Sequence, residues 1–488
     1  MPLFRNSAGC TIICVVCAML TAGCSSSPKQ AQLALREPPP HAPPQQLLSR
    51  DAAPDGVRTS SRGNPSEIKT VSHQELLDTL SHSTAGGDDL FAGHSELTLP
   101  ALVSEVQQRN PSLQAALAAW GAAAEKPPQA EALDDPMLQT MAAPGTFASS
   151  SSTQSSYIIA VGQKLPWSGK RGLRGQVAQW NAVAASLNHA EIQLRLAEAA
   201  RLAYYDYYYV FRQMELNEAN LAAVKAYRDT ARSKFEANQV SQQDLLQAEV
   251  ELARTEQMQV EIEKTGQVAT ARINQLLHRD PQLLLPPPPS RLEASASFVD
   301  VDVLREQALE RRPDLAAIAA KLHSEQNALA LACKEYYPDF EVMGKYDSFW
   351  TDVVQRGQVA LNLNIPLNQS RRGAAVREAL FNTSRIQAEY NSQVDLIKNE
   401  VQTAYARLEA SRRTLKLFEK KLLPATEANV SAAASGYTAG TVDFLRLVQA
   451  QREFLELNEK YQQAVVEFHR NRAELDRVVA TPVESGTL

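Results

Sequence analysis

The sequence predicts a mainly α-helical fold with membrane β-strands, built from a unit that occurs twice along the chain. Three observations predict it. Long proline-free stretches are dominated by Ala, Leu, Glu, Gln, Lys and Arg, the residues that lose least in a helix. Short segments alternate strictly between apolar and polar residues, as strands with two different faces do. Several motifs recur in the same order at nearly one offset, which indicates a duplicated unit of about two hundred residues.

The duplication rests on three pairs of matching segments, at offsets of 200 or 202 residues. The pairs are Pro166 with Pro366, Leu113 with Leu315, and the segment that begins at Phe235 with the one that begins at Tyr437. The 488 residues therefore divide better into two similar halves than into unrelated domains. We expect a first repeat at 97–290, a second at 291–480, and a short tail at 481–488.

The N-terminus has the features of a lipoprotein signal peptide. Arg5 precedes an apolar run, and the sequence "LTAGC" ends at Cys24, which the pattern predicts to be the lipidated first residue of the mature protein. Residues 1–23 are then the signal peptide. Residues 24–96 are rich in Pro, Ser and Gln, and we expect them to form a tether with little core of its own.

Each half is expected to begin with two short helices, which are followed by two strands. The predicted short helices are 99–108, one that starts at Pro111, 301–309 and 313–336. The predicted strands are 155–167, 340–349, 358–367 and a weaker one within 137–149. In the third of these strands Val359, Leu361 and Leu363 alternate with Ala360 and Asn362, so one face is apolar and the other is not.

Each half is expected to end in a long helical hairpin. No proline occurs from Ser168 to Asp280, and within that stretch Asn238 and Ser241 offer a turn and a helix N-cap. A helix of roughly 70 residues would be about 105 Å long, far longer than a globular domain needs. In the second half, Pro424 should kink or break the outgoing arm. The return arm has a regular heptad pattern at Leu447, Phe454, Tyr461, Phe468 and Leu475.

The strands predict assembly with further copies of the chain. Four strands are too few for a closed sheet, and each clear strand has about the ten residues that cross a bilayer when tilted. An open edge in hydrocarbon would leave backbone groups without hydrogen bonds, so an inserted sheet has to close. Two, three or four chains would give 8, 12 or 16 strands. The alternative is a water-exposed sheet packed on the helices, which would alternate in the same way.

Five motifs, taken together with their order and duplication, resemble one known family. They are "GQKLPWSGKRG" (Gly162–Gly172), "RRPDL" (Arg311–Leu315), "YYPDF" (Tyr336–Phe340), "LNIPLNQSRRG" (Leu363–Gly373) and "YTAGTVDFLRLVQAQ" (Tyr437–Gln451). They resemble the TolC-type outer membrane efflux proteins, and more closely the lipid-anchored branch that serves multidrug and heavy-metal pumps. The resemblance covers about residues 97–480.

This resemblance implies a homotrimer in which a 12-stranded β-barrel in the outer membrane continues into a periplasmic α-helical barrel. It implies a passive duct that carries small solutes, such as drugs or heavy-metal ions, from the periplasm to the exterior. The expected partners are a periplasmic adaptor protein, an inner-membrane pump that is typically proton-driven, and outer membrane lipid. No cofactor, bound metal or nucleic acid is implied, and the expected location is the outer membrane with a lipid anchor.

The resemblance also assigns the two hairpin turns to the periplasmic tip, where the adaptor binds. The tip positions are Asn238, Gln239, Val240, Ala439, Gly440 and Thr441. Gly440 suits a tight turn that requires a positive φ, and Asn238, its counterpart in the first repeat, tolerates that conformation next best.

In the family, polar links between the hairpins close the tip. The matching residues here are Asp244 and Tyr437, a carboxylate and a phenol hydroxyl. Arg446 and Gln449 occupy the positions at which some members have an acidic pair that lines the aperture, so the acidic gate is absent there. Asp244 has a second interpretation, as an acidic residue favoured by the dipole at a helix N-terminus.

The sequence also bears on three other function classes. An enzyme is disfavoured because the eight histidines are scattered and no GxSxG, HExxH or P-loop motif is present. A coiled-coil spacer lipoprotein that does not conduct would share the tether and the heptads, but it leaves the amphipathic strands unexplained. A duct for protein secretion shares the channel fold and stays open as an alternative.

Overall fold

The computed structural model of the chain describes residues 91, 95–142, 156–292 and 300–481. The predicted signal peptide, Cys24, almost all of the tether and nearly all of the tail lie outside the described residues. So does the second part of the weak strand predicted within 137–149. The boundaries assigned to these segments and to the two repeats stay predictions.

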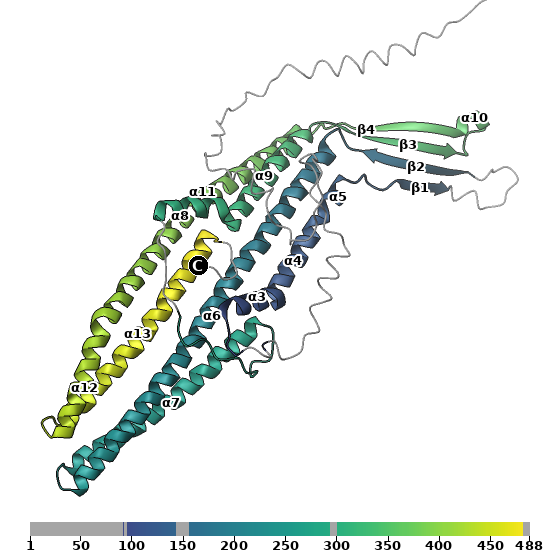
Figure 1. Ribbon diagram of the computed structural model, residues 1–488. Coiled ribbons are helices and arrows are strands. Elements are labelled where there is room, and N and C mark those ends of the chain that lie inside the picture. The colour runs from purple at the N-terminus through teal and green to yellow at the C-terminus, as the bar shows by residue number, and fades with distance from the viewer. Residues whose placement is uncertain (1–90, 92–94, 143–155, 293–299, 482–488) are drawn as a thin grey trace, which may run out of the picture. The chain divides into compact units, whose positions relative to one another are not determined.

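The first half contains short helices, two strands and a long helical hairpin, in the order that the sequence predicts (Figure 1). Its elements are α3 (Leu99–Arg109), α4 (Pro111–Ala124), α5 (Lys126–Glu131), β1 (Met137–Ala142), β2 (Tyr157–Leu165), α6 (Lys170–Glu236) and α7 (Gln242–Leu276). Helix α6 has 67 residues, which confirms the expected length of the first arm. The short helix α5 was not predicted.

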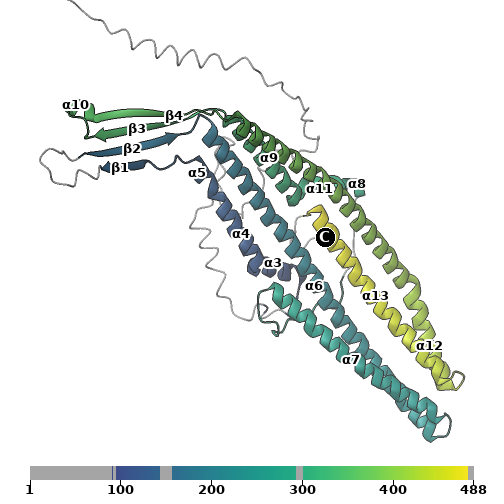
Figure 2. The same cartoon turned by 180° about the vertical axis from the view of Figure 1, so that it is seen from behind.

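The second half repeats the plan. Its elements are α8 (Val301–Arg311), α9 (Pro313–Lys334), β3 (Asp339–Asp347), α10 (Val353–Arg356), β4 (Gly357–Asn364), α11 (Gln369–Leu417), the π-helical turn η4 (Phe418–Leu422), α12 (Leu423–Ala439) and α13 (Phe444–Val479). In Figures 1 and 2 the strands lie at one end of the long helices, and the two hairpin turns lie at the other end. Among the described residues, no helix combines the length and the apolar character that crossing a bilayer requires.

The four strands form one antiparallel sheet in the order β1-β2-β3-β4. The central pair, β2 with β3, joins the two halves of the chain. Strands β2 and β4 end just before Pro166 and Pro366, because proline has no N–H with which to continue a ladder.

Pro424 interrupts the outgoing arm of the second hairpin, as predicted. The α-helical hydrogen bonding of α11 gives way to the π-helical turn η4, and α12 starts with Pro424 in its first turn. The Thr426 hydroxyl donates back to the Leu422 carbonyl oxygen, one turn earlier, at 2.6 Å. A π-helical turn is a recognised way for a helix to absorb such a disruption.

Apolar residues are buried in several clusters spread along the helices rather than in one central core. The largest cluster joins α3, α6 and α7 and includes the fully buried Leu102, Tyr204 and Ile273. The tyrosine-rich segment of α6 lies within this cluster, where packing explains its aromatic residues. Long helices that pack side by side bury their apolar stripes in this distributed way.

The junction between the sheet and the helices is held by Lys170, which is 1% exposed. Its ammonium group donates to Asp339 Oδ1 at 2.9 Å and to the Tyr337 carbonyl oxygen at 3.0 Å. The backbone N–H of Trp167 donates to the same Asp339 oxygen, and the Trp167 ring stacks on Tyr337. The two motifs "PWSGKRG" and "YYPDF" therefore meet at the point where the strands of the two halves become helices.

Candidate functional site

All four strands direct one set of side chains to a single apolar face. The register places Ile159 of β2 opposite Tyr346 of β3, and Val342 of β3 opposite Leu361 of β4. Directly opposed residues lie on the same side of a sheet. The large apolar side chains on this face, all exposed, are Leu138, Tyr157, Ile159, Val161, Leu165, Val342, Tyr346, Val359, Leu361 and Leu363. Among the described residues nothing covers the middle of β4 on this face, where Val359 is 85% exposed and Leu361 is 67% exposed.

The opposite face of the sheet is more polar. Asn362 donates to the Glu341 carboxylate at 3.3 Å, and Lys345 pairs with Asp347 at 2.9 Å. The apolar residues on this side are Met137, Met141, Ile158 and Met343, next to the small residues Ala160 and Gly162. A sheet with lipid on one side and water on the other shows this contrast.

The two outer strands, β1 and β4, each pair on one side only within the part of the chain that the structure describes. Each therefore presents an edge of backbone N–H and C=O groups. An exposed edge next to an exposed apolar face is a template for pairing with another strand.

The two hairpin turns, at the other end of the helices, have the same backbone geometry. Asn238 has a φ of 56° and Gly440 has a φ of 76°, which confirms the conformation predicted for both residues. The next residue in each turn donates back across it, from Gln239 N to Lys234 O at 2.8 Å and from Thr441 N to Gly436 O at 2.9 Å. The turns of the two repeats are thus structural equivalents as well as sequence equivalents.

Among the predicted tip residues, Gln239, Ala439 and Thr441 are exposed and Val240 is half-buried. The exposed side chains present small or uncharged groups at the end of the hairpins. The Thr441 hydroxyl donates to the Gly436 carbonyl oxygen at 3.2 Å.

Each return helix begins with a side-chain cap. Ser241 accepts from Asp244 N at 3.3 Å, and the Asp244 carboxylate accepts from Ser241 N at 3.2 Å, which is a reciprocal capping box. At the equivalent place in the second repeat, Asp443 accepts from Arg446 N at 3.2 Å. The interpretation of Asp244 as a residue of the helix N-terminus therefore has a direct structural basis.

Tyr437 is buried, and its hydroxyl has no hydrogen-bond partner among the described residues. Burial raises the pKa of the Tyr437 hydroxyl, and the negative charge of Asp244 raises it further. The two residues therefore lie near each other, but no hydrogen bond joins them in the single chain. Arg446 is exposed and pairs with Asp443 on its own helix at 3.7 Å, and Gln449 is exposed.

Sequence reasoning missed Lys234, which is the residue that contacts Tyr437 from the first hairpin. A signal was present in the sequence, because α6 has a polar or hydroxyl-bearing residue at every seventh position toward its C-terminal end. Those positions are Asp206, Gln213, Asn220, Tyr227 and Lys234. Within the described ranges, no group of three or more His, Cys, Asp or Glu side chains is arranged to hold a metal ion.

Comparison with known families and proteins points in one direction. Residues 304–481 match the family described as Outer membrane efflux protein. The chain is 24% identical over 394 residues to the cobalt-zinc-cadmium resistance protein CzcC of Cupriavidus metallidurans, an alignment that covers 78% of this chain and 90% of CzcC.

Solved structures share the fold. The outer-membrane channel OprN superposes with a TM-score of 0.69 at 21% identity, over 80% of this chain and 91% of OprN. The outer membrane protein VceC of Vibrio cholerae superposes with a TM-score of 0.67 at 17% identity, over 78% of this chain and 95% of VceC. At these identities the likeness shows a common fold.

Proposed function

We propose that this chain, an outer membrane efflux protein by its fold and by the family match of residues 304–481, is the channel subunit of a tripartite efflux system. It provides a passive duct from the periplasm to the exterior. The observation on which the proposal depends is the four-stranded sheet, with one continuous exposed apolar face and two free edges, directly joined to long helical hairpins.

The free edges support assembly as a ring of identical chains. If β4 of one copy pairs with β1 of the next, every backbone group at the sheet edges finds a partner, as a lipid environment requires. Three copies would give a 12-stranded barrel, a common size for an outer-membrane barrel. The hairpins of the three copies would then extend the wall of the duct away from the membrane.

The partners and the cargo follow by analogy. The turns at Asn238 and Gly440 would contact a periplasmic adaptor, and the adaptor would connect the duct to an inner-membrane pump. The relative CzcC is named for cobalt, zinc and cadmium resistance, so divalent metal ions are the cargo that we propose to test first, with drugs second. The pump, a different polypeptide, would select among them.

Single-channel recording tests the duct directly. The detergent-purified protein, with its oligomer mass measured first, is added to planar bilayers. We expect trimers that insert and conduct, at least at a low and gated level. A monomeric helical protein that never conducts would favour a spacer lipoprotein and overturn the proposal.

Lipid attachment at Cys24 needs its own test. Cells that express the wild-type protein are labelled with radioactive palmitate, alongside cells that express Cys24→Ala. We expect label in the wild-type protein, no label in the variant, and weaker membrane retention of the variant. Equal labelling of both proteins would refute the assignment of Cys24, whereas the matched variant Cys17→Ala should keep its label.

A further inference from the structure

The two hairpins of the chain meet along a polar row on α6. Each of its five members contacts the second hairpin: Asp206, Gln213, Asn220, Tyr227 and Lys234. A spacing of seven residues keeps them on one face of the helix. In an ordinary coiled coil the residues at this spacing are apolar. Between these two hairpins, polar contacts replace the apolar ones at about every second turn of α6.

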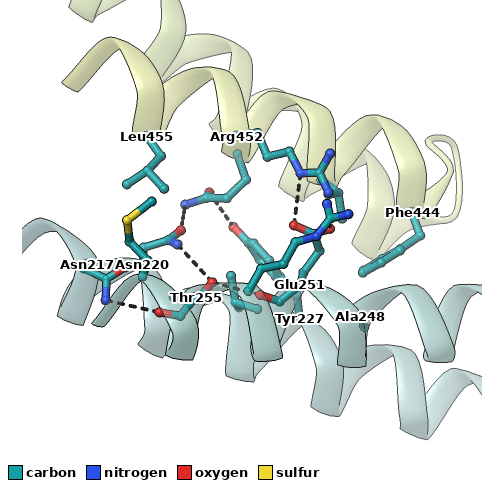
Figure 3. Close-up of a pocket in the computed structure, with 14 residues that line it drawn as sticks. Asn217, Asn220, Tyr227, Ala248, Glu251, Thr255, Phe444, Arg452 and Leu455 are labelled. Carbon is teal, nitrogen blue, oxygen red and sulfur yellow. Dashed lines mark hydrogen bonds and ion pairs between the residues drawn. The ribbon is translucent and has the colours of Figure 1, made fainter. Parts of the chain in front are cut away.

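Gln451 of α13 contacts two members of this row, Asn220 and Tyr227, which are both labelled in Figure 3. Its amide nitrogen donates to Asn220 Oδ1 at 3.0 Å, and its amide oxygen accepts from the Tyr227 hydroxyl at 3.4 Å. Asn220 in turn donates to Thr255 Oγ1 of α7 at 3.5 Å. One side chain of the second hairpin is thereby connected to both helices of the first.

An ion pair joins the hairpins beside Gln451. The Arg452 guanidinium of α13 binds both carboxylate oxygens of Glu251 of α7, one of them from Nε at 3.0 Å. The Glu251 side chain is 13% exposed, whereas that of Arg452 is 51% exposed. Arg254, one turn along α7, also reaches the Glu251 carboxylate, at 3.3 Å. Of these two arginines, Arg452 bridges the hairpins and Arg254 does not.

The packing around these contacts is loose. A cavity of about 140 Å³ lies between α6, α7 and α13, and its lining includes Asn217, Asn220, Thr255 and Glu251 (Figure 3). Toward the turns, the fully buried apolar residues of the first hairpin are Ala231 and Ala248, which are both small. Separating the hairpins here would expose only these small residues on the first hairpin, together with Phe444, Leu447 and Val448 of α13, and water could replace the polar contacts.

We propose that Glu251, Gln451 and Arg452 form a latch that holds the second hairpin against the first in the closed duct. Opening then means that the hairpins separate along the polar row, beginning at the latch. The inference rests on the proposed channel function and adds a gating site to it. It places the gating contact about three helical turns from the turn residues, at positions other than Asp244 and Tyr437.

Charge reversal tests the latch. In Arg452→Glu two carboxylates face each other across the hairpins, and we expect the open probability in planar bilayers to rise about threefold to tenfold. The matched control is Arg254→Glu, which places the same charge next to the same carboxylate within one hairpin and should leave the open probability near that of the wild type. The double variant Glu251→Arg with Arg452→Glu should restore the closed behaviour.

A cross-link provides the opposite perturbation. The variant carries Glu251→Cys and Arg452→Cys, and the exposed free cysteine Cys333 is replaced by Ser so that it cannot react. The assembled protein is treated with a short thiol-reactive cross-linker. We expect cross-linking within one chain and a duct that no longer opens. The uncross-linked sample of the same variant shows whether the protein still assembles.

The outcomes separate the latch from the channel itself. If the wild type conducts and both Arg452→Glu and the cross-linked variant gate like it, the latch is refuted and the channel function stands. If no protein conducts, including Arg452→Glu with its trimer mass intact, the channel function fails and the latch fails with it.

Discussion

Lys234, near the end of α6, lies over the ring of Tyr437 with its ammonium nitrogen 4.1 Å from the ring centroid. The same nitrogen donates to the Tyr437 carbonyl oxygen at 2.5 Å. One cation thus contacts both the side chain and the backbone of a residue in the other hairpin. Next to the two turns, the hairpins are held together by this contact.

Removing this cation should loosen the tip. In Lys234→Met the alkyl stem is kept and the charge is lost, which should cost about 1 kcal/mol of hairpin association and raise the open probability about fivefold. Single-channel recording measures the change. Lys225→Met, at an exposed position on the same helix, is the control. Equal behaviour of the two variants would show that Lys234 does not restrain the tip.

The predicted link between Asp244 and Tyr437 can be separated from helix capping. Asp244→Ala with Tyr437→Phe should raise the conductance, since it removes both groups of the predicted link. Ser241→Ala removes the cap at a cost of about 1 kcal/mol and leaves Asp244 in place. A rise of the same size in Ser241→Ala would mean that Asp244 acts through the helix end alone. A double variant identical to the wild type would place the lock at other residues.

The junction below the sheet should be sensitive to the loss of Lys170. Lys170→Met leaves the Asp339 carboxylate, whose side chain is 35% exposed, without its buried cation, a change that should cost about 2 kcal/mol. We expect the thermal unfolding midpoint of the assembled protein to fall clearly. Lys334→Met is the matched control, because Lys334 is only half-buried and its ammonium donates to the Ser168 carbonyl oxygen nearby. A midpoint unchanged in Lys170→Met would contradict the role given to this residue.

The buried imidazole of His469 should make stability depend on pH. Burial lowers the pKa of His469 from 6.5 to about 4, with the charge of Arg472 adding to the effect. The ring stacks on Tyr205, and its Nε2 has no hydrogen-bond partner among the described residues. Because the unfolded chain binds the proton more readily, stability is complete above pH 6.5 and falls as the pH drops toward 4, by about 3 kcal/mol.

Thermal unfolding of the wild type and of His469→Phe at pH 7 and pH 5 measures this dependence. The variant should lose less stability between the two pH values than the wild type. His323→Phe, on a different helix and beside Trp180, is the control and should behave like the wild type. An equal pH dependence in all three proteins would assign the effect to other groups.

Local features of this fold could be predicted from the sequence because their causes are local. Period-two alternation predicted β2, β3 and β4, and the residues that tolerate a positive φ predicted the turns at Asn238 and Gly440. Pro424 predicted an interruption but not its form, since a π-helical turn depends on how the whole arm packs. The four-residue helix α10 is too short to show a period.

The contacts between hairpins could not be predicted in the same way. Lys234 and Tyr437 are separated by two hundred residues, and their pairing depends on the relative rotation of two long helices. The resemblance to the TolC-type family pointed to Asp244 as the partner of Tyr437, whereas the carboxylate of Asp244 is used by the capping box. The five polar residues spaced seven apart on α6 can be recognised in the sequence, but only their contacts show that they face the second hairpin.

The unpaired edges of β1 and β4 have a consequence for how cells make this protein. If the chain assembles in the proposed ring, a newly made subunit has two unpaired strand edges and an uncovered apolar sheet, so it is most prone to aggregation before it pairs with other copies. Its biogenesis then requires a factor that shields these edges until the copies assemble. One damaged copy would disrupt every ring that it enters, so a lesion in β4 would be dominant in a cell that also makes the intact protein.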